Sequence, residues 1–118
     1  MSTILVVDDD REMGRLLKTL FELEGHQVVV VPRYEEVFSA LHRVLPDVVL
    51  LDVRLQNKET IELVHKMRQE EGLNDIPVVM TSGMDRRREC LEAGADLFIL
   101  KPFLPDEVVR MVGGLLKQ

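Results

Sequence analysis

Five short apolar runs alternate with amphipathic stretches along the chain, and this alternation constrains the fold most strongly. The runs are rich in β-branched residues, are nearly continuous, and span residues 4–7, 28–31, 48–51, 77–80 and 97–100. Such runs are typical of strands that are buried on both faces of a parallel sheet. Strands that alternate with helices in this way predict a doubly wound α/β sandwich.

The stretches between and after these runs repeat apolar residues every three or four positions, which is typical of helices that pack one face on a sheet. The first four are expected to end at Gly25, Pro46, Gly72 and Gly94, because glycine and proline commonly follow a helix. The fifth is expected to start at Asp106, a residue type that favours the N-cap. The residues expected to fill the core on this spacing include Met67, Met80, Cys90 and Met111.

Polar side chains follow four of the five apolar runs, where each predicted strand ends. They are Asp8 and Asp9 after the first run, Asp52 after the third, Thr81 after the fourth and Lys101 after the fifth. In an open parallel sheet, ligands bind beyond the carboxyl ends of the strands. The second run ends without such a group. A five-stranded sheet of order 2-1-3-4-5 would place that strand at the edge and bring the other four ends together.

This grouping of charges predicts chemistry with a metal ion and a phosphoryl group. Three carboxylates close together raise one another's pKa values, and a hard divalent cation such as Mg²⁺ relieves that repulsion. The ammonium of Lys101 and the hydroxyl of Thr81 both suit phosphoryl oxygens. A carboxylate can itself be the nucleophile and form an aspartyl-phosphate. Asp52 is the best candidate, since it ends a central strand between the other groups.

Other interpretations of these residues remain open at this point. Asp8 and Asp9 could serve only as N-caps of the first helix, with Lys101 as a structural ion-pair partner. A haloacid-dehalogenase-like phosphatase would need Asp-x-Asp followed by a small hydroxyl or apolar residue, and the segment DDDRE at 8–12 fits this poorly. A flavodoxin-type flavin binder would need a phosphate loop rich in Ser, Thr and Gly after the first strand, where this chain is acidic.

Four motifs together resemble the receiver domains of two-component response regulators, the CheY-like family with a flavodoxin-like fold. They are ILVVDDD (4–10), DVVLLDV (47–53), IPVVMTS (76–82) and AGADLFILKPF (93–103), and the resemblance covers essentially the whole chain. It implies that Asp52 is the phosphoacceptor. It also implies a site for Mg²⁺ or Mn²⁺ formed by Asp8, Asp9, Asp52 and the backbone carbonyl of Arg54.

The resemblance implies further roles at the same edge of the sheet. Thr81, Ser82 and Lys101 would contact the phosphoryl group. Thr81 and Phe98 would change position on activation, and the Lys101–Pro102 peptide bond would be cis.

The sequence departs from the family pattern at two places. The family commonly has proline four residues after the phosphoacceptor and glycine eight residues after it, where this chain has Gln56 and Thr60. The segment from Thr81 to Gly94 is also shorter than is usual, which would alter the face that carries the signal to partners.

The expected function is therefore a signalling switch that takes a phosphoryl group from a histidine kinase or a histidine phosphotransfer protein. Such a domain catalyses only its own phosphorylation and dephosphorylation, so it is not expected to be an enzyme with a separate substrate. Its state would be read by an output domain, an effector protein or a second copy of the chain. The alternative is a receiver-like interaction module that works without phosphorylation.

Composition limits the partners and the location. The net charge is −6, and we interpret the one basic run, Arg86–Arg88, as a solvated helix face, so direct nucleic-acid binding is not expected. A single cysteine is typical of a reducing, cytoplasmic protein, and no apolar run approaches the length of a membrane span. Residues 1–118 are expected to form one receiver domain, either alone or as the N-terminal part of a longer regulator.

Overall fold

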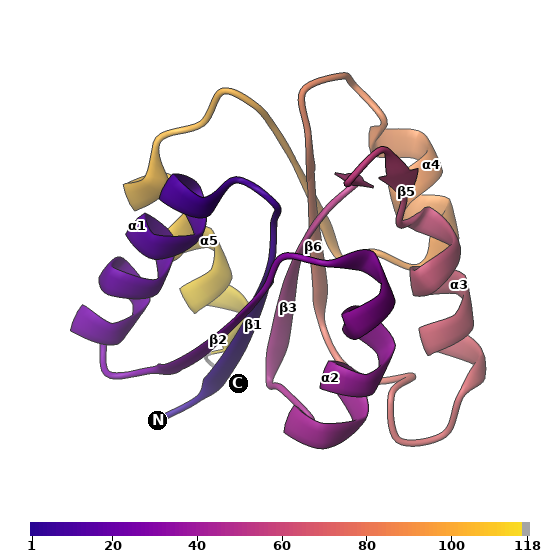
Figure 1. The fold of residues 1–118 in the computed structure, drawn as a ribbon, viewed down its shortest axis with the longest axis horizontal. Helices are drawn as coiled ribbons and strands as arrows, with labels where there is room; N and C mark the ends of the chain where they lie inside the picture. The colour runs from indigo at the N-terminus through magenta and orange to yellow at the C-terminus, as the bar shows by residue number, and fades with distance from the viewer. Residues whose placement is uncertain (117–118) are drawn as a thin grey trace.

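A five-stranded parallel sheet forms the centre of the protein, of which the computed structural model describes residues 1–116. The strands are β1 (Thr3–Val7), β2 (Gln27–Val31), β3 (Val48–Asp52), β6 (Val78–Ser82) and β7 (Leu97–Leu100). Their order is β2-β1-β3-β6-β7, which is the predicted order 2-1-3-4-5 counted along the chain (Figure 1). In register, Val7 of β1 lies opposite both Val31 and Leu51, so the carboxyl ends of the three strands are level.

Helices cover both faces of this sheet, as the alternating pattern predicts (Figure 1). They are α1 (Arg11–Leu23), α2 (Val37–Val44), α3 (Ile61–Gln69), α4 (Arg87–Ala93) and α5 (Pro105–Leu116), with a short 3₁₀ turn at Tyr34–Glu36. One core cluster contains buried residues of α1 and α5, and the other contains those of α2, α3 and α4. None of the helices in the described part of the chain is long and apolar enough to span a membrane.

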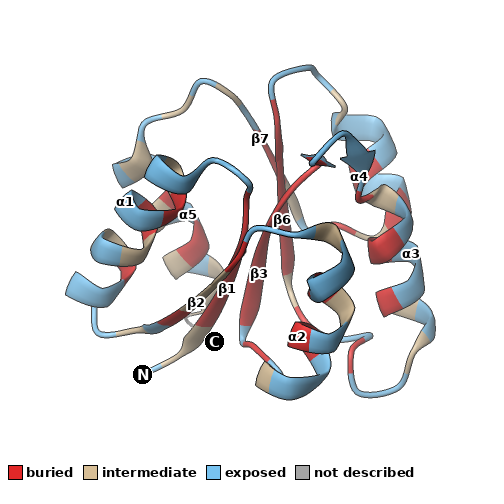
Figure 2. Ribbon diagram, in the orientation of Figure 1, coloured by how far each residue is buried: buried red, intermediate tan, exposed pale blue. Residues whose placement is uncertain are grey.

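The strands are apolar along most of their length because each face of the sheet is covered. Successive residues of β1 alternate between the two core clusters: Leu5 and Val7 pack under α2 and α3, while Ile4 and Val6 pack under α1 and α5. Figure 2 shows the strands buried along most of their length and the outer sides of the helices exposed. This rigid centre fixes the position of any side chain that follows a strand end.

A small β-hairpin follows β3, and the sequence pattern did not predict it. Strands β4 (Arg54–Leu55) and β5 (Lys58–Glu59) pair antiparallel, with Arg54 opposite Glu59. The two loop residues, Gln56 and Asn57, have φ angles of 52° and 68°. Two-residue hairpin loops of type I′ require such positive values, which Asn-Gly adopts more readily than Gln-Asn. The segment that lacks the family's proline is therefore an ordered turn.

Three local predictions were wrong. Helix α5 begins at Pro105, so Asp106 lies in its first turn; proline is favoured there because its fixed φ suits the first helical position. Helix α3 ends at Gln69, and Gly72, with φ of 94°, belongs to the turn that follows. Met111 is 39% exposed, because the face of α5 that packs on the sheet is centred on other residues, Val108 and Val112.

Candidate functional site

The carboxyl edge of the sheet brings the predicted polar residues together. Asp8 follows β1 directly, Asp52 is the last residue of β3, and Lys101 follows β7. Thr81, near the end of β6, is the register partner of Asp52, so the two residues lie side by side on neighbouring strands. Asp8, Asp52 and Thr81 are all almost fully buried, at 5%, 9% and 3% exposure. Their polar groups therefore depend on one another rather than on bulk water.

Three carboxylates form a compact acidic cluster at this edge. Oxygen atoms of Asp8, Asp9 and Asp52 all lie within 4.8 Å of one another, and Asp9 is exposed to solvent. Burial raises the pKa of the Asp8 carboxyl above its usual value, and the negative charge of Asp52 raises it further, against the opposing effects of the Asp10 N–H and Lys101. Hard carboxylate oxygens at this spacing are donors of the kind that Mg²⁺ prefers, so the residues fit a divalent cation.

Helix capping does not explain the acidic cluster. The N-cap of α1 is Asp10, whose Oδ1 accepts hydrogen bonds from the N–H groups of Glu12 and Met13 at 3.1 and 3.2 Å. Asp8 contributes only through its Oδ1, which accepts from the N–H of Asp10 at 2.9 Å. The interpretation of Asp8 and Asp9 as N-caps is therefore wrong, and both have carboxylate oxygens in the acidic cluster.

Lys101 neutralises part of this charge. Its Nζ donates to Oδ2 of Asp52 at 2.8 Å and lies 3.7 Å from Oδ2 of Asp8. Burial alone would lower the pKa of Lys101, but the hydrogen bond to Asp52 and the surrounding carboxylates raise it above its usual value. The ammonium therefore stays charged and offsets the burial of Asp52. Within residues 1–116, the other Asp52 oxygen, Oδ1, has only a long 3.5 Å hydrogen bond, from the N–H of Arg54.

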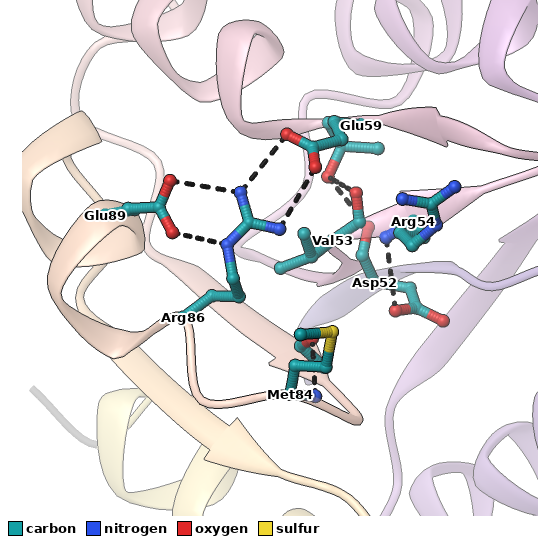
Figure 3. Close-up of polar contacts among 9 residues, drawn as sticks. Asp52, Val53, Arg54, Glu59, Met84, Arg86 and Glu89 are labelled. Atoms are coloured by element: carbon teal, nitrogen blue, oxygen red, sulfur yellow. Dashed lines mark hydrogen bonds and ion pairs between the residues drawn. The ribbon is translucent and has the colours of Figure 1, made fainter.

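The hairpin is anchored directly to the strand that ends in Asp52. Thr60, which is fully buried, directs its hydroxyl at the carbonyl oxygens of Asp52 and Val53, at 2.7 and 3.2 Å. The N–H of Gln56 donates to Oδ2 of Asp9 at 2.9 Å. Figure 3 shows Asp52 and Val53 beside Arg54 and Glu59 of the hairpin. Sequence reasoning noted Thr60 only as a departure from a pattern, and no spacing rule pointed to this anchoring role.

These geometric findings agree with comparison to known proteins. The model of the response regulator receiver domain family matches residues 4–113. The chain belongs to this family. It spans about half the length of the curated relatives that it matches. The phosphate regulon transcriptional regulatory protein PhoB of Pseudomonas aeruginosa is 30% identical, over 98% of this chain and 52% of that protein. The DNA-binding response regulator MtrA of Mycolicibacterium paratuberculosis is 33% identical, over 98% and 51%.

Solved structures of receiver domains have the same fold. A putative response regulator from Chloroflexus aurantiacus superposes with a TM-score of 0.89 at 30% identity, covering 99% of this chain and 98% of that one. The BeF₃-activated N-terminal receiver domain of Klebsiella pneumoniae RstA gives a TM-score of 0.87 at 30% identity, covering 98% and 99%. The resemblance stated from the four motifs and the flavodoxin-like fold are both confirmed.

The remaining predicted residues of this receiver domain lie in, or directly after, strands β6 and β7. Ser82 is buried, and its Oγ accepts the N–H of Met84 at 3.1 Å, which shapes the loop after β6. Phe98 is 5% exposed and packs in the core, with the guanidinium of Arg87 5.3 Å from its ring centroid. The Lys101–Pro102 peptide bond is cis.

Proposed function

We propose that this receiver domain is the phosphoacceptor of a two-component system and that Asp52 accepts the phosphoryl group. The observation that supports this most directly is the setting of Asp52: a nearly buried carboxylate held by Lys101 at 2.8 Å beside two further carboxylates. A carboxylate that served only as an ion-pair partner would not need a second acidic pair next to it. The donor in the cell would be a histidine kinase or a histidine phosphotransfer protein.

The chain's own residues would carry the transfer. A carboxylate oxygen of Asp52 forms a bond to phosphorus while the bond from phosphorus to the donor nitrogen breaks and the donor leaves with the electron pair. Asp8, Asp9, Asp52 and the carbonyl of Arg54 would hold Mg²⁺ or Mn²⁺, which would neutralise charge on the phosphoryl oxygens. Lys101 would exchange its contact with Asp52 for one with a phosphoryl oxygen. The hydroxyls of Thr81 and Ser82 would donate to the others.

The signal would follow from the added charge. A phosphoryl group brings about −1.5 to −2 charges and new hydrogen-bond acceptors. A shift of Thr81 toward it, accompanied by Phe98 two strands from Asp52, would change the surface around α4. The readers would be an output domain, an effector protein or a second copy of the chain, and the domain would turn over no separate substrate. A cytoplasmic location belongs to the same proposal and rests on the family.

Intact-mass measurement after incubation with acetyl phosphate tests this proposal. The wild-type protein with Mg²⁺ is expected to gain one phosphoryl group, and to gain none with EDTA. Asp52→Asn should gain none in either condition. Asp75→Asn is the matched control, because Asp75 is an exposed aspartate in the turn after α3, away from the carboxyl edge of the sheet. A folded wild-type protein that gains no mass would favour the interaction module that works without phosphorylation.

A further inference from the structure

We propose that Arg86 is a positioning residue for the phosphoryl site, because it connects the hairpin β4–β5 to the loop that follows Thr81 and so holds these two segments beside Asp52 at a fixed separation. The contact itself stands without the proposed function, whereas its consequence for phosphorylation rests on it.

Arg86 makes ion pairs with two glutamates from different elements (Figure 3). Its two terminal nitrogens lie 3.0 and 3.2 Å from the two carboxylate oxygens of Glu59 in β5. Its Nε and one terminal nitrogen contact Glu89 in α4, the latter at 3.1 Å. The Arg86 side chain is only 18% exposed, although Glu59 and Glu89 are 48% and 57% exposed. Such paired contacts fix the orientation of a planar guanidinium, which a single ion pair does not.

On the hairpin side, the ion pair between Arg86 and Glu59 is connected to Asp52 through Arg54. Glu59 lies opposite Arg54 in the two-stranded ladder. Arg54 is the residue whose N–H is 3.5 Å from Oδ1 of Asp52, and its carbonyl is the one that the proposed function assigns to the metal. The same hairpin contacts Asp9 through the N–H of Gln56. By holding Glu59, Arg86 therefore also holds the hairpin backbone that contacts Asp52 and Asp9.

On the other side, Arg86 closes the loop that starts at the end of β6. Ser82 ends that strand, its Oγ fixes the N–H of Met84, and Arg86 immediately precedes α4. The carbonyl of Arg86 also accepts the N–H of Cys90 in the first turn of α4. The loop is thus fixed at its start by a buried hydroxyl and at its end by Arg86. A displacement of Thr81 toward a phosphoryl group would therefore also move the hairpin, through the ion pair between Arg86 and Glu59.

The neighbouring arginines do not make this connection. Arg88 pairs with Glu92 within α4 at 3.5 Å, and both side chains are highly exposed, at 90% and 71%. Arg87 lies over the ring of Phe98. The interpretation of the run 86–88 as a solvated helix face therefore fails for Arg86, which is half-buried between two elements. Arg88, two residues further along in α4, offers a matched control for the loss of one positive charge.

Amide hydrogen exchange on the unphosphorylated full chain tests the link without any phosphodonor. In Arg86→Ala, the amides of residues 54–59 and 83–86 are expected to exchange about two- to fivefold faster, the size that suits a largely exposed ion-pair network. Glu59→Gln should produce the same change at residues 54–59, and the double variant should add little there, because both substitutions remove the ion pair between Arg86 and Glu59. Arg88→Ala should leave these amides as in the wild type.

The dissociation constant for Mg²⁺ provides the second readout. If Arg86 only stabilised the fold, this constant would not change in proportion to the amide exchange rate. It should rise in Arg86→Ala by about the same factor as the exchange rate, while the midpoint of urea unfolding shows that the variant is folded. Arg86→Lys keeps the charge but cannot make paired contacts, so it should recover the wild-type values only in part.

The proposal is overturned if Arg86→Ala exchanges like the wild type in both segments, if the effects of Arg86→Ala and Glu59→Gln simply add, or if Mg²⁺ affinity is unchanged. Each of these results can occur while wild-type Asp52 is still phosphorylated, which would leave the proposed function standing. Conversely, a wild-type chain that is never phosphorylated would refute the proposed function, while exchange and Mg²⁺ binding would still decide on the link.

Discussion

At the scale of single residues, the site depends on the balance between the negative charges of its carboxylates and the positive charge of Lys101. Asp8 and Asp52 are nearly buried, and Lys101 is the only cation among the described residues that pairs with either. Two buried carboxylates and one ammonium leave an excess of negative charge, to which exposed Asp9 adds. This excess of like charge costs stability, and a divalent cation bound by the three carboxylates would offset it.

Asp8→Asn should stabilise the protein in EDTA at neutral pH. The folded-state pKa of Asp8 is raised by burial, so the folded state favours the protonated carboxyl; its stability contribution is present at low pH and is lost as pH rises through the raised pKa. Removing the charge should raise the melting temperature by about 2–5 °C at pH 7. The difference should vanish under acidic conditions, and Mg²⁺ should stabilise the variant less than the wild type. An unchanged or lower melting temperature at pH 7 would contradict this account of Asp8.

The residues that sequence reasoning found are those whose positions follow from the sheet. Asp8, Asp52, Thr81 and Lys101 each lie at or within one residue of the carboxyl end of a buried strand, so the strand order alone brings them together. Thr60 and Arg86 were not found, because their partners are set by a hairpin and a loop whose paths carry no periodic signal. Asp10, not Asp8 or Asp9, caps α1, a distinction that requires backbone angles.

At the scale of elements, the hairpin β4–β5 takes the place of the rigid turn that the family resemblance led one to expect. Its two positive φ angles at Gln56 and Asn57 put the N–H of Gln56 on Asp9. The departure from proline at this position is thus consistent with the local conformation, since proline fixes φ near −65° and has no N–H.

Gln56→Pro, which restores the family's common residue, should therefore destabilise this chain. The substitution cannot adopt φ of 52° and removes the hydrogen bond to Asp9, so a loss of about 2–4 kcal/mol in the free energy of unfolding is expected. Gln56→Asn is the control, because asparagine tolerates a positive φ and keeps the N–H; it should be neutral or slightly stabilising. Urea unfolding measures both. Equal stability of Gln56→Pro and wild type would show that this hairpin does not form.

A second link between elements should depend on pH. In α2, Nδ1 of His42 lies 2.8 Å from the carbonyl oxygen of Phe38, and its Nε2 contacts Glu70 just after α3. Both partners are acceptors, so the doubly protonated ring is favoured, and the hydrogen bond to Glu70 raises the pKa of His42 above 6.5. The link stabilises the fold below the ordinary histidine pKa and is lost as pH rises through the raised value.

An NMR titration of His42 checks this prediction. The pKa should lie above 6.5 in the wild type and fall in Glu70→Gln, which keeps the size of the side chain but removes its charge. A pKa that does not respond to Glu70→Gln would contradict the assigned contact.

At the scale of the whole molecule, the fold was predictable because one rule governs it. Continuous apolar runs separated by helical periodicity admit few arrangements other than a parallel sheet covered on both faces, and right-handed crossovers reduce these further. The surface was less predictable. Met111 is 39% exposed, and the seven-residue helix α4 is preceded by Arg86, which forms an ion pair with Glu59. Under the proposed function, partners would bind this less regular surface, whereas the chemistry would take place at the carboxyl edge of the sheet.

The central claim is that one carboxylate of this edge, Asp52, accepts a phosphoryl group. Its most direct test is to treat the wild-type protein with acetyl phosphate and Mg²⁺, reduce the acyl phosphate with borohydride, and locate the modified residue by peptide mass spectrometry. Modification confined to residue 52, and absent when EDTA replaces Mg²⁺, is the predicted result. Modification at Asp8 or Asp9, or none at all in a folded protein, would contradict the account.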